Sequence, residues 1–489
     1  MEYHGIILGG NYTLYGGRNI ASFRLRTAAK TFGYDILAVD SSVSLKQAEL
    51  ESLLDKVVTE KTMMIGISTV WLNAYSPNTV HWLNDSFFNH IKTKFPHVTI
   101  VAGGPTGNWV IGSHTIYKHA EWVMHGFSDI AFTKFLDLLS GKSDHGLIYH
   151  RTLDGKKTVY SDSSHAVANP DDIETVFEEG DGFLPHQPVP LEVSRGCIFR
   201  CSFCNHPFQG AKDYDSYMRT PNSLARELRR NYDLFGTTRY VLMDDTFNDS
   251  IEKLDRLKRA IEISKIPSFQ FMSYLKPELL VSKPEMIPML RDLGLKSGFV
   301  GIESLQKTAR KAVKKGMDID RILDSIAELN SVAGSSMHAS FIVGLPGDTK
   351  EDIFNTYDFL KSSKNQYFKS WVFHQMSFFY DKNLQGFSEM DKNPEKYGYT
   401  LTSKKPDHFA DWVSAQMTSN QARLYSKALN EDSKNYMSIA GWYLPLAWHI
   451  GLTDIEIETS MIKDIDPFAI GVATNRSQAL SVLKKFNCL

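Results

Sequence analysis

Cysteine is scarce in this chain, whose 489 residues contain four. So low a count excludes the disulfide framework of a small secreted domain, which needs several bridges to hold it together. We therefore expect a reducing compartment and predict a cytoplasmic protein. Three of the four cysteines nevertheless lie within eight positions of each other, at Cys197, Cys201 and Cys204.

Long apolar runs and a large net charge are also missing. No stretch approaches the roughly 18 uninterrupted apolar residues of a membrane-spanning helix, and residues 1–10 lack the basic and apolar regions of a signal peptide. The formal net charge of −2 gives no general attraction to an anionic membrane or to nucleic acid. We expect no membrane partner, and nucleic acid is neither indicated nor excluded.

The composition that remains is that of an ordinary globular protein, with 42% hydrophobic and 22% charged residues. A chain of this length is expected to fold as two to four domains, each with its own core. We place the boundaries at a first domain 1–141, an acidic and proline-containing linker 142–185, a second domain 186–380 and a C-terminal region 381–489.

The three clustered cysteines follow the spacing Cys-x3-Cys-x2-Cys. Buried structural cysteines scatter through a core, whereas three thiols on one short loop converge and suit a metal cluster. A closed zinc site or a [4Fe–4S] cluster held by protein alone needs four ligands. Three thiolates thus leave one iron open to a small molecule; the alternatives are a zinc site completed by His206, or coincidence.

Short apolar runs alternate with helical patterns through residues 1–141, which predicts a doubly wound parallel sheet of Rossmann type. One helix is expected from the spacing of Val80, Leu83, Phe87 and Ile91. Ligands of such sheets lie at the carboxyl ends of the strands. The residues expected there are Gly9, Gly10, Ser68, Thr69, Gly103, Gly104, His125 and Gly126.

Six further strand–helix units are expected in residues 186–380, where they predict a partial (β/α)6 barrel with its chemistry at the carboxyl ends of the strands. The expected strands are residues 189–193, 239–243, 268–273, 298–302, 337–343 and 371–375. A helical stretch at 309–330 is expected to break at Gly316. The region after residue 380 is expected to be mainly helical, with one helix beginning at Trp412.

The cysteine loop and the strand ends that follow it resemble the radical S-adenosylmethionine (SAM) enzymes. The resemblance implies a [4Fe–4S] cluster on Cys197, Cys201 and Cys204, SAM on the open iron, and an electron donor such as flavodoxin or ferredoxin. The residues that it implies as SAM contacts are Phe203, Asp244, Asp245, Glu303, Ser304, Gly344 and Pro346. The arginine common on the third strand is absent, and Tyr274 or Lys276 is the candidate replacement.

Residues 1–141 resemble the cobalamin-binding domain that precedes the radical core in one subgroup of this family. The cobalamin contacts implied by the layout are Gly9, Gly10, Ser68, Gly103, Gly104 and Gly126. The Asp-x-His-x-x-Gly loop of many cobalamin proteins is absent, since the corresponding stretch reads Gly-Asn-Tyr-Thr-Leu-Tyr-Gly. The alternative is a degenerate domain retained for substrate or partner contacts.

These resemblances predict a single-cluster radical SAM enzyme, and favour a cobalamin-dependent C-methyltransferase acting on a small molecule or a peptide. The first alternative is a cobalamin-independent isomerase, epimerase or rearrangement enzyme, which could act on a nucleotide. The second is an iron–sulfur redox sensor or scaffold without catalysis. The sequence identifies neither the substrate nor the catalytic residues beyond the cluster ligands.

Overall fold

The computed structural model describes residues 2–10, 18–68, 80–104, 115–125, 128–143, 147, 149–151, 157–160, 171, 174–204, 217–379, 388–404 and 409–489. The chain divides into two compact units. The first consists of Met1–Pro185, Asp233–Gly236 and Phe468–Leu489, and the second of His186–Tyr232 and Thr237–Pro467.

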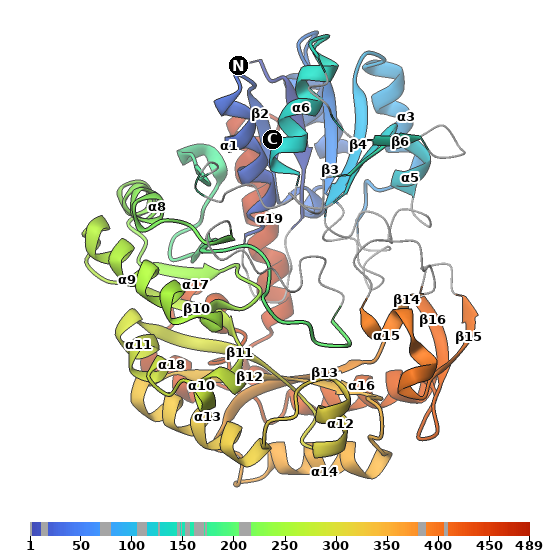
Figure 1. The fold of residues 1–489 in the computed structure, drawn as a ribbon. Helices are drawn as coiled ribbons and strands as arrows, with labels where there is room; N and C mark the ends of the chain where they lie inside the picture. Colours follow the sequence, from blue (N-terminus) through green and yellow to red (C-terminus); the bar gives the residue numbers. More distant parts are fainter. Residues whose placement is uncertain are drawn as a thin grey trace. The chain divides into compact units, whose positions relative to one another are not determined.

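The first unit is built on a seven-stranded sheet with the order β2-β1-β3-β4-β5-β7-β6 (Figure 1). Its strands are β1 (Gly5–Leu8), β2 (Ile36–Val39), β3 (Met64–Ser68), β4 (Thr99–Gly104), β5 (Trp122–His125), β6 (Tyr149–Arg151) and β7 (Lys157–Tyr160). All neighbouring strands are parallel except β6 and β7. The doubly wound parallel sheet is confirmed, and its switch point lies between β1 and β3.

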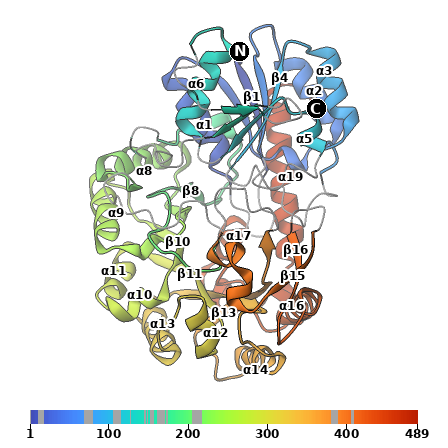
Figure 2. The same ribbon diagram turned by 45° about the vertical axis from the view of Figure 1, so that its right-hand side comes forward.

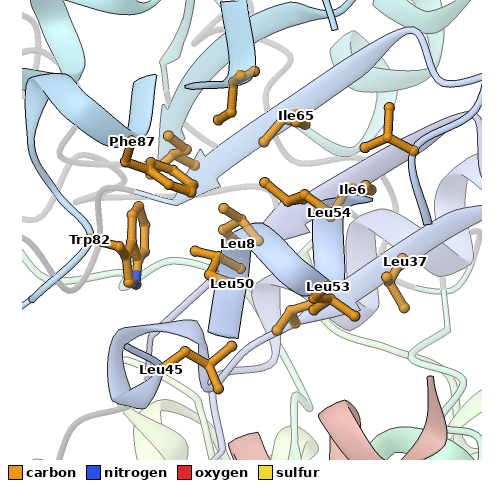
Figure 3. Packing of buried hydrophobic residues seen from close by; sticks show 14 of the residues in the cluster. Ile6, Leu8, Leu37, Leu45, Leu50, Leu53, Leu54, Ile65, Trp82 and Phe87 are labelled. Carbon is orange, nitrogen blue, oxygen red and sulfur yellow. The ribbon is translucent and has the colours of Figure 1, made fainter. Parts of the chain in front are cut away.

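Helices cover both faces of this sheet because its strands are apolar on both sides. Ile6 and Leu8 of β1 pack with α2 (Gln47–Val57), α3 (Asp85–Lys94), α5 (Thr115–His119) and α19 (Pro467–Lys485), as Figure 3 shows for part of this cluster. Ile7, which points the other way, packs with α1 (Ala21–Thr31) and α6 (Asp129–Leu139).

Three features of the first unit differ from the sequence-based expectation. The helix expected to include Val80 and Leu83 begins only at Asp85, because the Asn84 side chain caps it by accepting a 3.0 Å hydrogen bond from the Phe87 amide. Strands β6 and β7 belong to the sheet although they fall within the predicted linker. Helix α19 belongs to this unit although it lies at the far end of the chain.

The second unit is built on six parallel strands in chain order, and this order confirms the predicted partial (β/α)6 barrel. The strands are β8 (Val189–Leu191), β9 (Arg239–Leu242), β10 (Gln270–Leu275), β11 (Leu295–Glu303), β12 (Ser336–Val343) and β13 (Phe368–Gln375). Figure 2 shows the helices along the outside of this arc. They are α8 (Pro221–Phe235), α9 (Ile251–Ser264), α10 (Pro277–Ser282), α11 (Met286–Leu293), α12 (Lys307–Ala312), α13 (Ile319–Ala333) and α14 (Lys350–Lys361).

The region after β13 combines helices with a small antiparallel sheet. The helices are α15 (Glu389–Lys392), α16 (Ser419–Ser433), α17 (Leu444–His449) and α18 (Asp454–Thr459). The sheet, of order β14-β16-β15, consists of β14 (Phe378–Phe379), β15 (Thr400–Lys404) and β16 (Phe409–Val413). The prediction that a helix begins at Trp412 is therefore wrong. Thr418 and Gln421 form the capping box that starts α16 instead.

This small sheet packs on the loop that follows β12. The Tyr399 hydroxyl donates a 2.5 Å hydrogen bond to the Gly344 carbonyl, and the fully buried Trp412 donates from Nε1 to the Met376 carbonyl at 2.9 Å. Gly344 has φ +95°, and a Cβ there would lie 2.6 Å from Trp412 Cη2. Only glycine therefore fits between this loop and the tryptophan ring.

No helix within the described ranges combines the length and the apolar character needed to cross a membrane.

We predict that Gly344→Ala destabilises the protein more than Gly398→Ala. Both glycines have positive φ values, +95° and +84°, but nothing lies within 4 Å of a Cβ at Gly398. Backbone strain alone is expected to lower the free energy of unfolding by about 1–2 kcal/mol. The clash with Trp412 adds to this at Gly344 only. Urea unfolding followed by tryptophan fluorescence measures both effects, and equal destabilisation would contradict the packing described.

Candidate functional site

The three clustered cysteines lie on a loop that begins just after β8, at the carboxyl-end edge of the parallel sheet of the second unit. Hydrogen bonds close the base of this loop. Ser194 and Met218 form an isolated β-bridge, the Arg195 amide donates to the Tyr217 carbonyl at 2.9 Å, and the Arg219 amide donates to the Val193 carbonyl at 2.9 Å. The loop therefore starts and ends at fixed points.

Buried ion pairs lie beneath the base of the loop. Arg195 forms an ion pair with Glu192, and Arg219 Nη1 lies 2.6 Å from Glu227 Oε2. Arg219 Nη1 also donates to the Glu192 carbonyl at 3.1 Å. All four side chains are buried. Removing one partner would leave an uncompensated buried charge, so these pairs hold the strand end in one conformation.

Asp244, which we predicted as a SAM contact, binds the start of the cysteine loop. Its carboxylate accepts hydrogen bonds from the Val193 amide at 2.9 Å and from the Ser194 hydroxyl at 2.6 Å. Lys253 Nζ lies 3.5 Å from the same carboxylate. Burial raises the pKa of Asp244 to about 6, against the opposing effects of Lys253 and these hydrogen bonds. The residue positions the start of the cysteine loop, and both of its carboxylate oxygens are used in doing so.

The neighbouring Asp245 is half-buried at the same strand end. Its carbonyl accepts a 2.8 Å hydrogen bond from the Thr246 hydroxyl, whose oxygen also lies 3.4 Å from Cys197 Sγ. This segment therefore connects the β9 end with the first cysteine. The SAM contacts predicted for Asp244 and Asp245 both stay predictions.

All three loop cysteines are free thiols and half-buried. Burial raises the pKa of Cys197, while the hydrogen bond with Thr246 opposes this. Within the described residues, no three His, Cys, Asp or Glu side chains approach closely enough to hold a single metal ion. In a cubane cluster each thiolate binds a different iron, so the sulfurs need not meet at one point. The alternative zinc ligand, His206, lies outside the described residues.

Two lysines bring positive charge to this loop and to the neighbouring strand end. Lys276 Nζ lies 4.0 Å from Cys201 Sγ and 4.3 Å from the centre of the Phe199 ring. Lys315 Nζ donates to Glu303 Oε1 at 2.8 Å and to the Gly301 carbonyl at 2.6 Å. Burial acts to lower the pKa of Lys315, but Glu303 and the other nearby anions outweigh it and the pKa is raised. Tyr274 and Lys276 both stay candidates for the role of the family arginine.

A hydrogen bond between Ser304 and Asp348 joins the segments that follow β11 and β12. Glu303, the last residue of β11, has φ +67°, a strained conformation for a residue other than glycine. The hydroxyl of Ser304 then donates to Asp348 Oδ1 at 3.0 Å. Burial raises the pKa of Asp348 to about 7. Both Glu303 and Ser304 therefore lie at the predicted edge of the sheet, and each is fixed by a partner.

The other predicted SAM contacts occupy the same two loops. Phe203, within the cysteine loop, and Pro346, after β12, are half-buried, whereas Gly344 is buried beneath Trp412. Sequence reasoning missed Tyr399 and Trp412 as residues that fix the Gly344 loop. No local pattern could have found them, because they contact the loop across more than 50 residues of sequence.

In the first unit, the strand ends carry the small residues expected for a flat ligand. Gly9 is tightly packed, because a Cβ there would lie 2.7 Å from Ser22 Oγ. Gly103 and Gly104 end β4, the latter with φ +143°. Gly10 and Ser68 follow or end their strands as predicted. Gly126, Thr69 and the 11–16 part of the loop without a histidine lie outside the described residues.

Several polar atoms near the ends of β1 and β2 are buried without a hydrogen-bond partner in the part of the chain described. They are Ser22 Oγ, Ser41 Oγ, Arg18 Nη1 and both side-chain amide atoms of Asn475. Ser22 lies against Gly9, and Arg18 Nε pairs with Asp40 Oδ2 at 2.6 Å. Unsatisfied buried polar atoms are uncommon in folded proteins, so each of these groups needs a hydrogen-bond partner that the described residues do not supply.

Asn475 reaches this region from the far end of the sequence. It lies on α19, where the adjacent Arg476 donates to the Ser44 carbonyl at 3.0 Å and pairs with Glu49 at 2.6 Å. Ala479, one turn along on the same helical face, is part of the sheet's apolar cluster. This placement brings the Asn475 amide to the side of the sheet where β2 ends.

Comparison with known proteins identifies the second unit. The family model of the Radical SAM superfamily matches residues 191–360. The tRNA-2-methylthio-N(6)-dimethylallyladenosine synthase of Acinetobacter baylyi is 27% identical over 213 residues, which cover 41% of this chain and 42% of that protein. The hopanoid C-2 methylase of Rhodopseudomonas palustris is 29% identical over 164 residues, 33% of this chain and 31% of that protein. The chain thus spans less than half the length of these curated relatives.

Solved structures share the fold over a greater length. The radical SAM methyltransferase TsrM from Kitasatospora setae, with cobalamin and a [4Fe–4S] cluster bound, has a TM-score of 0.63 at 14% identity, covering 100% of this chain and 99% of its own. The cobalamin-dependent radical SAM enzyme OxsB, with aqua-cobalamin and SAM bound, has a TM-score of 0.54 at 14% identity, covering 81% and 56%. At such identities the likeness is one of fold.

We predict that Asp348→Asn changes the pH dependence of stability. Its folded-state pKa of about 7 lies above the unfolded value of about 3.9. The wild-type protein therefore loses stability as the pH rises from 5 through 7, because the buried carboxyl must ionise. The asparagine variant lacks this loss and can still accept from Ser304. Between pH 5 and 8, the free energy of unfolding of the variant is expected to rise by about 2 kcal/mol relative to that of the wild type.

Urea unfolding at the two pH values tests this expectation. Asp324→Asn, an exposed position on α13, is the matched control and is expected to follow the wild type. A difference between Asp348→Asn and wild type that stays constant with pH would contradict the expectation.

Proposed function

We propose that this chain, which belongs to the radical SAM superfamily, is a cobalamin-dependent methyltransferase that acts on carbon in a small molecule or a peptide. The observation that carries the proposal is the loop of Cys197, Cys201 and Cys204, fixed at its base and placed at the carboxyl ends of a partial (β/α)6 barrel. When bound, a [4Fe–4S] cluster with SAM supplies a 5′-deoxyadenosyl radical, and cobalamin supplies a carrier for the methyl group.

The residues around the cysteines fit a cluster with one open iron. Three thiols are free, and burial, which raises the pKa of Cys197, is opposed by Thr246. The ammonium of Lys276 lies 4.0 Å from Cys201 Sγ, so a positive charge stands beside the position proposed for a cluster ligand. The fourth cysteine of the sequence, Cys488, belongs to the first unit, where its thiol donates to the Ser52 carbonyl at 3.7 Å.

The residues that we propose to hold SAM line the same edge. The Asp245 carboxylate suits the methionine ammonium, to which it can make a charge-assisted hydrogen bond. Glu303 is fixed by Lys315 and Ser304 by Asp348, so both present their remaining acceptors in defined directions. Phe203, Gly344 and Pro346 supply the apolar and backbone surface that an adenine needs.

The first unit fits cobalamin in two respects. Gly103 and Gly104 leave the end of β4 without large side chains, so that a flat macrocycle can approach the backbone there, whereas Gly9 is already packed against Ser22. The unpartnered polar atoms of Ser22, Ser41 and Asn475 can hydrogen-bond its amide or nucleotide groups. The TsrM and OxsB structures, which are similar in fold, hold cobalamin. The hopanoid methylase supports methylation as the reaction type.

We predict that Cys201→Ala abolishes SAM cleavage and lowers the bound iron from about four atoms per chain. Cys488→Ala is the matched control. The Cys488 thiol lies in the first unit, so this substitution is expected to change neither SAM cleavage nor the amount of bound iron. Iron analysis after anaerobic reconstitution and detection of 5′-deoxyadenosine give the two readouts. Wild-type cleavage by the Cys201→Ala protein would exclude the assigned cluster.

We predict that the wild-type protein retains about one hydroxocobalamin per chain through gel filtration, and that Asn475→Leu weakens retention about tenfold to a hundredfold. Removing one partner of a buried hydrogen bond has an effect of about this size. Asn435→Leu, at an exposed position in the second unit, is the control. The visible spectrum of the protein fraction measures retention, and the iron content shows that the second unit is intact.

Three outcomes of this experiment differ in meaning. If Asn475→Leu raises stability without changing cobalamin retention, the Asn475 amide is an unpaired buried polar group that destabilises the fold, and not a cofactor contact. If the wild type retains no cobalamin but still cleaves SAM, the cobalamin-independent radical rearrangement becomes the better assignment. If the wild type neither holds a cluster nor cleaves SAM, the enzyme assignment fails.

A further inference from the structure

A row of aromatic side chains crosses the inner face of the barrel sheet. The register pairs Tyr274 of β10 with Phe299 of β11, and Phe299 with His338 of β12. The ring centres of Tyr274 and Phe299 lie 4.8 Å apart, and those of Phe299 and His338 lie 4.9 Å apart. Strand alternation places Phe299 on the face opposite Val300, which is fully buried.

Trp442 joins this row from the C-terminal region. Its ring centre lies 4.7 Å from Phe299, 5.5 Å from His338 and 5.8 Å from Tyr274. We call these four residues, Tyr274, Phe299, His338 and Trp442, the aromatic floor. The rings meet at tilted or perpendicular angles, which is the favourable geometry for aromatic contacts.

Hydrogen bonds to two strands hold Trp442 in place. The Ser297 hydroxyl of β11 donates to the Gly441 carbonyl at 2.7 Å. The Trp442 amide donates to the Ser370 hydroxyl of β13 at 3.2 Å. A Cβ at Gly441 would lie 2.2 Å from Ser370 Oγ, so only glycine allows this approach. The segment is therefore a fixed part of the barrel interior.

The same serine determines which ring nitrogen of His338 carries the proton. Ser370 Oγ already accepts from the Trp442 amide, and it lies 2.8 Å from His338 Nδ1. Its hydroxyl is buried and has no other acceptor in the described structure, so it donates to Nδ1. Burial lowers the pKa of His338 to about 3, and the ring is neutral. Nε2 therefore carries a hydrogen, and within the described residues that hydrogen has no acceptor.

Small side chains lie between the aromatic floor and the carboxyl ends of the barrel strands. The next row on the inner face contains Gly301 and Ser340, two residues along each strand from Phe299 and His338, which is about 7 Å. His374, one row further, is exposed, yet its surroundings desolvate it enough to lower its pKa. Tyr274 is also 38% exposed.

We infer that the aromatic floor binds a flat aromatic or heteroaromatic ring of the substrate, and that His338 Nε2–H donates a hydrogen bond to a nitrogen or carbonyl oxygen of that ring. This inference rests on the proposed function, since it names the substrate class of the same barrel. Aromatic faces and edges attract a further flat ring, and the His338 Nε2–H, which has no acceptor among the described residues, can donate to an acceptor on that ring. A saturated ring lacks the flat π face, and a ligand without an acceptor leaves the donor unpaired. His338 is assigned as a specificity-determining residue.

The test uses two probes with the same carboxamide group. Nicotinamide has a flat ring, and cyclohexanecarboxamide has a saturated one. Saturation-transfer NMR is recorded on the reconstituted enzyme with saturating SAM and an oxidised cluster, so that the SAM site is filled and no turnover occurs. We expect the nicotinamide signal to exceed that of cyclohexanecarboxamide at least fivefold.

Two variants locate the bound ring. His338→Phe keeps an aromatic ring but removes the donor, and Trp442→Leu removes part of the floor while keeping the backbone bonds to Ser297 and Ser370. Each is expected to lower the nicotinamide signal at least fivefold, and the iron content of each variant shows whether its cluster loop is intact. His97→Phe, a matched change at an exposed position of the first unit, is expected to have no effect.

The outcomes separate this inference from the function on which it rests. Equal signals from the two probes overturn it, as does a nicotinamide signal that both variants leave unchanged. If His338→Phe fails to incorporate iron, Trp442→Leu alone decides, and an unchanged signal in that variant overturns the inference. Loss of SAM cleavage in the wild-type protein would instead contradict the proposed function.

Discussion

The buried carboxylate of Asp244 is the interaction on which the rest of the candidate site depends. It accepts hydrogen bonds from the Val193 amide and the Ser194 hydroxyl, and so joins the end of β9 to the first residues of the cysteine loop. Lys253 lies between Asp244 and Asp249, at 3.5 and 2.9 Å, and it is completely buried. If Asp244 were neutralised, the buried ammonium of Lys253 would keep only Asp249 as an ion-pair partner. The position of the cysteine loop therefore depends on Asp244.

Charge is distributed so that the site can hold several negative groups in a small volume. Three thiolates on an iron cluster and the carboxylate of SAM all carry negative charge. Lys276 and Lys315 supply two cations at the same edge, and each is fixed by contacts to the protein: Lys276 by Glu278 and the Phe199 ring, and Lys315 by Glu303. Pre-arranged charges of this kind stabilise a bound anion without reorganisation during the reaction.

Much of this arrangement could be predicted from sequence, because its patterns are local. The alternation of apolar runs and helical periods predicted both parallel sheets, and the cysteine spacing indicated the cluster loop. Prediction failed where contacts with residues distant in the sequence determine the role or the secondary structure of a residue. Adjacent Asp244 and Asp245 look equivalent in sequence, and only tertiary contacts reveal that the first is used to bind the backbone of Val193. Likewise Trp412 has the spacing of a helix but pairs as a strand.

The C-terminal region shows the same limit most clearly, because it completes both units. Helix α19 returns to the first unit and brings Asn475 to the strand ends, while Trp442 enters the barrel of the second. Neither segment carries a motif, and each lies more than 70 residues from its partners in the sequence. In each place a polar hydrogen-bonding group is left unpaired, the amide of Asn475 and, among the described residues, the Nε2–H of His338 beside Trp442. A fold that leaves such groups buried loses stability unless a ligand satisfies them. Asn475 and His338 are therefore the ligand contacts that we propose beyond the sequence motifs.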